Sequence, residues 1–445
     1  MSESLTAVVL AAGMGTRMKS GRAKVLHPLA GRTLIGHVLA TAGRLEPEKA
    51  VVVLARDMDD VAAEVSRADL ATAVAIQDPP LGTGHALMAA RDELPTTGDV
   101  LVLYGDTPLL TPGTLMQLLA KRRGTDAAVA VFGIRPPDPS GYGRLRFEGD
   151  ALVELVEERH ADEALKRDGL CNAGIMAIDA ARLGTLLDSL ELKQPKGEYY
   201  LTDIVEHACR CGWTCTAIEG PWEEGHGVNA QHQLAEAEAV VQGRLRSAAM
   251  ERGVIMPAPE TVHLSADTEL APGVELQPYV VFGPKVRVAA GAVIKSFSHL
   301  EGADIGAGAE IGPYARLRPG SEIGERAKIG NFVETKNTVL ASGAKANHLT
   351  YLGDAAIGAK SNIGAGTITC NYDGFNKYRT EIGEGVFVGS NTALVAPVTI
   401  ADGAMIGAGS TITEDVPADG LAIARGRQAN MPEGAARFRA GKSKT

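Results

Sequence analysis

A chain of 445 residues exceeds what one ordinary hydrophobic core accommodates, so the sequence predicts at least two domains. The net charge of −10 argues against a nucleic-acid-binding surface, and the sequence holds no apolar run of about 18 residues that would form a membrane-spanning helix. The start of the chain has no basic stretch followed by a long apolar one, so we expect no secretory signal. Five cysteines without framework spacing fit the reducing cytoplasm.

The amino half alternates short apolar runs with helix-like segments. The predicted strands are Ala7–Leu10, Ala50–Leu54, Ala73–Ile76, Val100–Tyr104 and Ala127–Ile134, and the predicted helices include Gly84–Leu94 and Thr114–Lys121. This alternation predicts a Rossmann-like α/β domain, in which helices cover both faces of a mainly parallel sheet. Ligands of such sheets lie beyond the carboxyl ends of the strands, so residues that follow each strand are candidate site residues.

The loop after the first strand has the composition of a phosphate-binding loop. Residues 10–20 read LAAGMGTRMKS, in which glycines let backbone N–H groups approach an anion and Arg17 offers a bidentate donor. Met18 stands where a Walker loop or a dinucleotide fingerprint needs glycine, which excludes both. A tight turn explains two glycines equally well. The longer string, continued by AKVL at 23–26, resembles the signature of sugar-phosphate nucleotidyltransferases.

Two further strand ends carry polar groups. Gln77 precedes a glycine loop at 82–84, and together these features can read a pyrimidine edge through hydrogen bonds. Asp106 follows a buried strand, where a carboxylate needs a cationic partner, and a magnesium ion that bridges phosphates is the natural one. The alternative for Asp106 is a capping role in the next turn.

A group of potential ligands near residue 210 does not have the spacing of a zinc site. His207, Cys209, Cys211 and Cys215 lie where the sequence predicts the end of a helix and the following strand. Residues 231–252 then predict one long, proline-free helix, and we interpret it as a linker between a domain at 1–230 and a second one at 253–445.

A six-residue period dominates the carboxyl half. Apolar residues recur at this spacing in three series: Leu264, Leu270, Leu276, Phe282, Val288 and Ile294; Ile305, Ile311, Leu317, Ile323 and Ile329; Ile382, Val388, Leu394, Ile400, Ile406 and Ile412. The period fits neither a helix nor an ordinary strand. It predicts a parallel β-helix with three faces per coil and the apolar residues stacked inside. The resemblance to hexapeptide-repeat proteins implies that this helix is left-handed.

The repeat is interrupted where a pure scaffold would continue. The frame slips after Ile329, and counting back from Ile363 and Ile357 places Tyr351 and Lys345 at repeat positions. A second interruption, residues 369–380, is too long and too polar to form another six-residue repeat. Such interruptions in a rigid repeat are candidate functional sites.

These motifs resemble one family over nearly the whole chain. With GYGR at 141–144, NAGI at 172–175, GEYYLTD at 197–203 and GVN at 227–229, they are similar to the enzymes that join an N-acetylglucosamine-1-phosphate uridylyltransferase to a glucosamine-1-phosphate N-acetyltransferase. The resemblance implies uridylyl transfer from UTP with release of pyrophosphate. It assigns Arg17 and Lys24 to charge neutralisation, and Asp106 and Asn229 to Mg²⁺. The further nucleotide and sugar contacts that it implies are Leu10, Ala11, Ala12, Gly13, Gln77, Gly82, Thr83, Tyr104, Gly105, Gly143, Glu157 and Asn172.

The same resemblance implies acetyl transfer from acetyl-CoA to glucosamine-1-phosphate in the β-helix. His348 is then the general base, a role that suits histidine near neutral pH; the alternative for this residue alone is a hydrogen-bonded surface histidine. The implied contacts are Arg318, Lys336, Tyr351 and Asn362 for the sugar phosphate, and Ala365, Asn371, Tyr372, Ser390, Ala408 and Arg425 for acetyl-CoA. The family also implies a homotrimer that forms through the β-helix, and the basic tail at 436–445 is either a solvated end or a coenzyme-phosphate contact.

Two rival interpretations remain at this point. In the first, the chain is a nucleotidyltransferase whose β-helix only assembles or regulates the protein. In the second, it is a non-catalytic sugar-nucleotide-binding protein, which the combination of Arg17, Lys24 and Asp106 disfavours.

Overall fold

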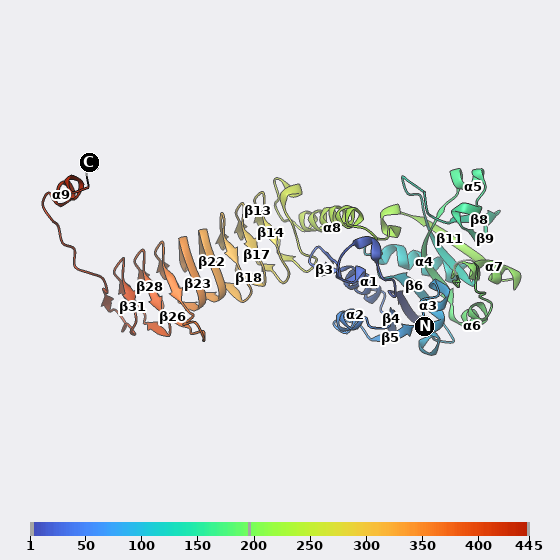
Figure 1. Cartoon of the computed structure of the whole chain (residues 1–445), viewed down its shortest axis with the longest axis horizontal. Coiled ribbons are helices and arrows are strands. Elements are labelled where there is room, and N and C mark those ends of the chain that lie inside the picture. The colour runs from blue at the N-terminus through green and yellow to red at the C-terminus, as the bar shows by residue number, and fades with distance from the viewer. Residues whose placement is uncertain (1–3, 195–196, 443–445) are drawn as a thin grey trace. The chain divides into compact units, whose positions relative to one another are not determined.

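The computed structural model describes residues 4–194 and 197–442, except the side chain of residue 168. The chain forms two units, Met1–Arg244 and Leu245–Thr445, and their division falls inside helix α8 (Gln231–Glu251) (Figure 1). Residues 443–445 of the basic tail lie outside the described residues. The described part of that tail contains α9 (Gly434–Ala440), whose residues are mostly exposed.

Unit 1 contains a nine-stranded sheet whose central path runs β11-β7-β10-β6-β1-β4-β5. Neighbouring strands on this path are parallel, except that β10 is antiparallel to both β6 and β7. The antiparallel pair β8–β9 adjoins the start of β10. The strands are β1 (Leu5–Leu10), β4 (Lys49–Ala55), β5 (Thr72–Gln77), β6 (Asp99–Tyr104), β7 (Val129–Ile134), β8 (Arg144–Glu148), β9 (Ala151–Val156), β10 (Cys171–Asp179) and β11 (Cys215–Gly220), with a separate pair β2 (Pro28–Leu29) and β3 (Arg32–Thr33).

Helices cover both faces of this sheet, as predicted. Along β1, Ala7 and Val9 belong to one hydrophobic cluster while Val8 and Leu10 belong to another, because successive side chains of a strand point to opposite faces. The predicted helix from Gly84 is shorter than expected and ends at Ala89. The helices are α1 (Leu34–Gly43), α2 (Asp59–Val65), α3 (Thr83–Ala89), α4 (Pro112–Gly124), α5 (Glu163–Asp168), α6 (Ala180–Asp188) and α7 (Asp203–Arg210).

The cysteine-rich segment has the predicted helix-then-strand structure. Helix α7 ends at Arg210, and β11 begins at Cys215, whose side chain is buried in the core. In the described part of the chain, no helix is long and apolar enough to cross a bilayer.

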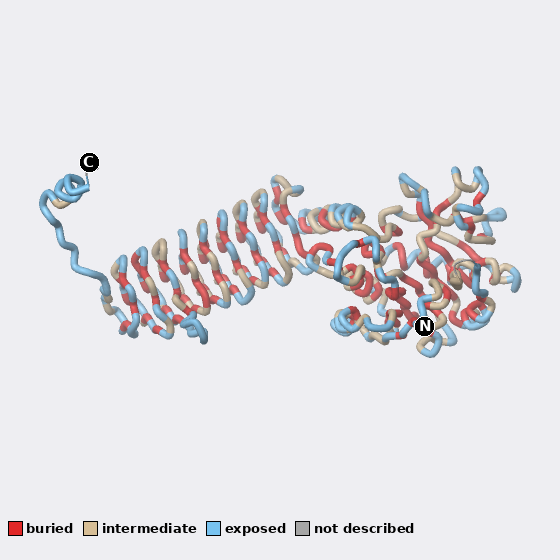
Figure 2. The backbone as a smooth tube through the Cα atoms, in the orientation of Figure 1, coloured by how far each residue is buried: buried red, intermediate tan, exposed pale blue. Residues whose placement is uncertain are grey.

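Unit 2 is a parallel β-helix with three strands per coil. Each short strand pairs in parallel with the third strand along the chain, as β12 does with β15 and β13 with β16. The seventeen predicted repeat residues all lie in one buried cluster, which confirms the repeat assignment. Figure 2 shows the buried positions recurring from coil to coil.

The strands of unit 2 are β12 (Glu269–Leu270), β13 (Glu275–Leu276), β14 (Val281–Phe282), β15 (Arg287–Val288), β16 (Val293–Ile294), β17 (His299–Leu300), β18 (Ala303–Ile305), β19 (Glu310–Ile311), β20 (Arg316–Leu317), β21 (Ser321–Ile323), β22 (Lys328–Leu340), β23 (Lys345–Ile357), β24 (Asn362–Ile363), β25 (Ile368–Cys370), β26 (Thr380–Ile382), β27 (Phe387–Val388), β28 (Ala393–Val395), β29 (Val398–Ile400), β30 (Met405–Ile406), β31 (Thr411–Ile412) and β32 (Leu421–Ala422).

The predicted position of the frame slip is wrong. Thr335 is buried and continues the six-residue frame beyond Ile329; the next inward residue is Leu340, five positions later. Ala346 and Leu352 then point inward, and Ile357 follows Leu352 after only five positions, so counting back by six from Ile357 lands one residue too early. Lys345 and Tyr351 are therefore not repeat residues, and their side chains belong to the outer surface, where they can meet a ligand.

One corner of the β-helix carries a column of aromatic rings. Tyr279, Phe297, Tyr314 and Phe332 stack with centroid separations of 5.1, 4.9 and 5.3 Å along the column. Each has a positive φ, between 55° and 63°, which is strained for a residue with a side chain. Stacking of this kind contributes about 0.5–1.5 kcal/mol per pair and offsets part of that strain.

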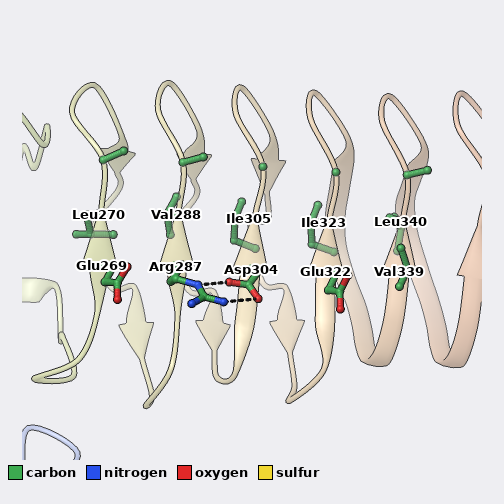
Figure 3. Close-up of a pocket in the computed structure, with 15 residues that line it drawn as sticks. Glu269, Leu270, Arg287, Val288, Asp304, Ile305, Glu322, Ile323, Val339 and Leu340 are labelled. Carbon is green, nitrogen blue, oxygen red and sulfur yellow. Dashed lines mark hydrogen bonds and ion pairs between the residues drawn. The ribbon is translucent and has the colours of Figure 1, made fainter.

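One face of the β-helix carries a shallow pocket of about 720 Å³ (Figure 3). Alanine and glycine at successive corners leave the space, and the Arg287–Asp304 ion pair, with 2.6 Å between Nε and Oδ1, borders it. None of the residues predicted for acetyl transfer lines this pocket.

Candidate functional site

A pocket of about 330 Å³ lies at the carboxyl ends of the strands of unit 1. Its walls come from the loops after β1, β5 and β6, the edge at which α/β sheets bind ligands. Ten residues predicted from the sequence line it: Leu10, Ala11, Ala12, Gly13, Lys24, Gln77, Gly82, Thr83, Tyr104 and Asp106. Glu198 and Tyr200 also line it, and they were not among the predicted contacts, although the GEYYLTD string contains them.

Lys24 joins the two residues predicted to hold a metal ion. Its Nζ lies 2.5 Å from Asp106 Oδ2 and 3.0 Å from Asn229 Oδ1, and the side chains of Lys24 and Asp106 are only 12% and 15% exposed. A backbone bond from Val228 N to the Asp106 carbonyl, 2.8 Å long, holds the GVN loop against this strand end. A carboxylate and an amide oxygen therefore converge on one cation, which is the donor set that Mg²⁺ accepts when phosphates and water complete its shell.

Arg17 lies outside this group. It is in the short 3₁₀ turn Thr16–Met18, its side chain is exposed, and no ion pair to it occurs within residues 4–194 and 197–442. Gly105 contributes space instead, because a Cβ there would lie 3.1 Å from Ala11 Cβ. It lets the end of β6 approach the loop that follows β1.

Gly15 sets the position of Lys24. Its φ of +62° is one that residues with a side chain rarely adopt, and a Cβ at this position would overlap the side chain of Lys24.

Replacing Gly15 by alanine should displace Lys24 and strain the loop. We expect a loss of about 1–3 kcal/mol in stability of unit 1 from the unfavourable backbone conformation. Thermal denaturation and pyrophosphate release measure the two effects. Gly21→Ala is the matched control, since a Cβ at Gly21 meets no atom within 4 Å and its φ is not positive. Equal behaviour of the two variants would contradict this explanation.

The side chain of Gln77 is fixed at the wall of the pocket. It is buried at the end of β5, and its Nε2 donates to the Gly82 carbonyl at 2.8 Å. Within the described residues no donor reaches its Oε1, so this oxygen of a pocket-lining residue has its acceptor capacity available. Gly82 has a φ of 93°, and a Cβ there would lie 2.7 Å from the Tyr199 carbonyl, so the loop requires glycine at this position.

Tyr104 remains a neutral phenol at physiological pH. Desolvation, reinforced by the negative charge of Asp106, raises the pKa of Tyr104 to about 12. The Thr83 side chain hydrogen-bonds to it. On its other side a Cβ at Gly174 would lie 2.8 Å from the ring, which explains the glycine of the NAGI motif.

The three predicted sugar contacts of unit 1 lie together. Asn172 N donates to the Gly143 carbonyl at 2.9 Å, and a Cβ at Gly143 would lie 3.3 Å from the carbonyl of Val156, the residue before Glu157. The ends of β8, β9 and β10 thus bring Gly143, Glu157 and Asn172 to one place. Glu157 is exposed, and Asn172 and Gly143 are partly buried.

A second cluster of polar residues lies on unit 2, on the surface of the β-helix. Arg318 pairs with Glu334, its Nη1 lying 2.8 Å from Oε1. Lys336 lies in register with Gly353, where the absence of a side chain makes room for the Tyr351 hydroxyl. Lys377, which was not predicted, approaches Lys336 closely, and this contact lowers the pKa of Lys336. Two adjacent lysines beside an arginine are the kind of cationic cluster that suits an anion.

His348 is exposed at the corner next to this cluster. Its Nδ1 lies 2.7 Å from Asn331 Oδ1, and the two residues are in register on neighbouring coils. An amide oxygen only accepts, so Nδ1 carries the proton and Nε2 presents a lone pair. Asn331, which was not predicted, therefore fixes the tautomer that a general base requires.

The predicted acetyl-CoA contacts follow the same corner. Asn391 N donates to Ala365 O at 2.7 Å, Gly409 N donates to Ser390 O at 2.8 Å, and the Arg425 guanidinium donates to Ala408 O. Ala365, Ser390, Ala408 and Arg425 thus lie on successive coils in line with His348.

The remaining predicted contacts do not lie on this column. Asn371 and Tyr372 are at the next corner along the chain, where Asn371 donates to Asp354 and Asp354 accepts from Asn337. Asn371 is 8% exposed at the base of the 371–379 loop, whereas Tyr372 is 60% exposed. Asn362 lies apart, because it is in register with Lys345 and Phe387, whereas Tyr351 is in register with Glu334 and Ile368. Asn362 and Tyr351 therefore lie on different faces.

Comparisons with known proteins agree with both units. Residues 7–170 match the MobA-like NTP transferase domain, and residues 302–337 and 379–414 match the bacterial transferase hexapeptide repeats. The chain is 53% identical over 441 residues to the bifunctional protein GlmU of Paramagnetospirillum magneticum, covering 99% of this chain and 97% of that protein. The chain belongs to the GlmU family. GlmU of Azorhizobium caulinodans is 54% identical over 446 residues, with 100% and 99% covered, and GlmU of Rhodospirillum rubrum is 54% identical over 436 residues, with 98% and 97% covered.

Membership of the GlmU family confirms the predicted fold class and the bifunctional character. The GlmU chain has a Rossmann-like nucleotidyltransferase domain followed by a left-handed parallel β-helix of hexapeptide repeats. It is an enzyme with two transferase domains. Among solved structures, the inositol-1-phosphate CTP transferase from T. maritima is 13% identical with a TM-score of 0.45, covering 54% of this chain and 97% of that chain.

Proposed function

We propose that the chain makes UDP-N-acetylglucosamine in two steps. The β-helix transfers acetyl from acetyl-CoA to glucosamine-1-phosphate, and unit 1 then transfers uridylyl from UTP to the N-acetylglucosamine-1-phosphate formed, with release of pyrophosphate. The observation that carries the proposal is the presence of two separate polar sites, one around Lys24 and Asp106 and one around His348, in a chain of the GlmU family.

For acetyl transfer, the Nε2 lone pair of His348 takes a proton from the substrate amine as the amine attacks the thioester carbonyl. The C–N bond forms, the C–S bond breaks, and CoA leaves as the thiol or thiolate. Arg318, Lys336 and Lys377 bind the phosphate of the acceptor, with Tyr351 beside it. Asn371 and Tyr372 adjoin the acetyl group, and Ala365, Ser390, Ala408 and Arg425 follow the coenzyme. These roles position the reactants and supply one base.

For uridylyl transfer, the sugar phosphate attacks the α-phosphorus of UTP in line and pyrophosphate departs. Lys24 and Arg17 neutralise the triphosphate, while Gly143, Glu157 and Asn172 hold the sugar. Asp106 and Asn229 would hold Mg²⁺, which supplies further charge neutralisation when bound. The convergence of their oxygens on the Lys24 ammonium supports this assignment. Leu10–Gly13, Thr83, Tyr104 and Gly105 complete the nucleotide site.

The orientation of Gln77 supports a uracil base. An Oε1 acceptor pairs with the N3–H of uracil, whereas cytosine presents an acceptor at N3. Gln77→Leu should lower kcat/KM for UTP by about 10–100-fold, because the loss of a base-reading hydrogen bond leaves polar groups of the site unpaired. The preference for UTP over CTP should shrink in parallel. Acetyl transfer, measured on the same preparation, should be unchanged, and a variant that keeps the full UTP preference would contradict base recognition by Gln77.

The position of Asn362, on a different face of the β-helix from Tyr351, supports a homotrimer. If Arg318, Lys336 and Tyr351 hold one sugar phosphate, Asn362 of the same chain lies on another face, and a neighbouring copy supplies this contact. A cytoplasmic location belongs to the same proposal, since both acetyl-CoA and UTP are available there, and the cysteines of the described residues are all unpaired.

Product analysis with both substrate sets on one purified sample tests the proposal. Glucosamine-1-phosphate with acetyl-CoA should release CoA, and N-acetylglucosamine-1-phosphate with UTP and Mg²⁺ should release pyrophosphate. Pyrophosphate without CoA would mean that the β-helix is a scaffold. The absence of both products would mean that the chain only binds sugar nucleotides.

A further inference from the structure

Asp354 lies beside the β-helix site and has none of the roles assigned above. Both of its carboxylate oxygens are engaged: Asn337 Nδ2 donates to Oδ1 at 2.6 Å and Asn371 Nδ2 donates to Oδ2 at 2.5 Å. Two amide donors from different coils therefore fix the orientation of the carboxylate. Burial raises the pKa of Asp354, but these bonds and the nearby Lys377 and Lys336 outweigh it, so that its pKa lies below the usual range and the group is ionised.

The charge of Asp354 balances an unusual pair of lysines. The pKa of Lys336 is lowered by the close approach of the Lys377 ammonium, by desolvation and by Arg318, whereas Asp354 raises it. Glu334, the other acid beside this cluster, already pairs with Arg318 at 2.8 Å. The carboxylate of Asp354 is thus the counter-charge that favours two ammonium groups side by side before an anionic substrate arrives.

Asp354 also holds the base of the 371–379 loop. Tyr378 N donates to the Asn371 carbonyl at 2.9 Å, and Tyr372 and Lys377 form an antiparallel bridge across the loop. Lys377 therefore belongs to the same hairpin that Asn371 begins. Fixing Asn371 fixes the point from which Lys377 reaches back to Lys336.

We propose that Asp354 is a positioning residue for acetyl transfer. It holds Asn371 at the base of the 371–379 loop, and through this hairpin it positions Lys377 beside Lys336, where both meet the phosphate of the acceptor. The conformation of the 371–379 loop and the binding of the sugar phosphate therefore both depend on the carboxylate of Asp354. The proposal rests on the proposed acetyl transfer in the β-helix.

The test is Asp354→Asn in the full-length chain. This variant keeps the size of the side chain and removes its charge. We expect kcat/KM for glucosamine-1-phosphate to fall by about 10–100-fold, the range found when a partner that orients a functional group is lost. Asp304→Asn is the matched control, because Asp304 also accepts hydrogen bonds on the β-helix but pairs with Arg287 and lies three coils away, in register through Glu322 and Val339 with Ala356. Pyrophosphate release should remain unchanged in both variants.

Two readouts separate positioning from a merely structural role. Removing the carboxylate lowers the pKa of Lys336 further, so the rise in KM for glucosamine-1-phosphate at alkaline pH should begin at lower pH than in the wild type. In an Asn371→Ala background, Asp354→Asn should have a smaller effect than in the wild type, because part of its action passes through Asn371. The proposal would be overturned if the effects of Asp354→Asn and Asn371→Ala were additive and KM for glucosamine-1-phosphate rose at the same alkaline pH as in the wild type. A wild-type kcat/KM in Asp354→Asn would also overturn it.

Failure of the proposal differs from failure of the proposed function. A wild-type chain that releases no CoA counts against acetyl transfer itself, whereas an active wild type with an equally active Asp354→Asn counts against Asp354 alone. If Asp354→Asn melts below the assay temperature, Asp354→Glu takes its place. It keeps the charge and moves the carboxylate, so kcat/KM should fall while KM for glucosamine-1-phosphate rises at the same alkaline pH as in the wild type. An unchanged kcat/KM would overturn the proposal.

Discussion

His348→Ala should reduce acetyl transfer by about 10²–10⁴-fold, the contribution of a positioned general base. The residue is exposed at a corner and packs against no core cluster, so its removal leaves no cavity. The loss should therefore appear in the rate of CoA release with glucosamine-1-phosphate and not in thermal denaturation. Uridylyl transfer by the same sample should continue at the wild-type rate.

His299→Ala is the control for His348→Ala. His299 is also exposed on the β-helix, in register with Val281 and Arg316, and belongs to none of the proposed sites. It should retain full acetyl transfer. If His348→Ala released CoA as fast as His299→Ala, another group would have to be the base.

Asp106→Asn should reduce uridylyl transfer by about 10²–10³-fold while acetyl transfer is retained. The amide keeps the shape of the side chain but removes the charge that attracts Lys24 and would hold Mg²⁺, and electrostatic groups in such sites contribute this much to the rate. The expected readout is pyrophosphate release at saturating UTP. Raising the Mg²⁺ concentration should restore part of the activity if binding of the ion is weakened.

Asp188→Asn is the matched control for Asp106→Asn. Asp188 also forms an ion pair, with Arg91, but its side chain is 67% exposed and lies in none of the proposed sites. Exposed pairs of this kind contribute about 0–1 kcal/mol, so both activities should be unchanged. A comparable loss in the two variants would show that the effect of Asp106→Asn is not specific to the nucleotide site.

The sequence was sufficient for the parts of the fold that repeat. The six-residue period identified residues such as Ile311 and Val388 as inward-facing, because every coil has the same geometry and one side chain per face fills the core. It misplaced Lys345 and Tyr351, because the corner between Leu352 and Ile357 is one residue shorter, so counting back by six from Ile357 lands one position too early. It also ended the frame at Ile329, because the next inward residue, Thr335, is polar yet buried. A polar residue inside and a shortened corner cannot be seen in a hydrophobic pattern.

Site residues could be predicted from the sequence where they directly follow a strand. Asp106 and Gln77 follow strands directly, and both line the predicted pocket. Lys377 was missed because it lies in a loop, and only the fold of that loop brings it to Lys336. Asn331 was missed because its role depends on the register between two coils, which places it beside His348.

The stacked coils have a consequence for where the β-helix opens. Each coil bonds only to the coils before and after it, so local unfolding spreads like the melting of a one-dimensional array and begins at the frayed ends. The 13-residue strands β22 and β23 hold Lys336, His348 and Asp354, and they have paired coils on both sides. These acetyl-transfer residues are thereby protected from local unfolding of the terminal coils. Arg425 lies on the same corner as His348 but several coils further along, so the coenzyme site extends toward the end of the array that opens more readily.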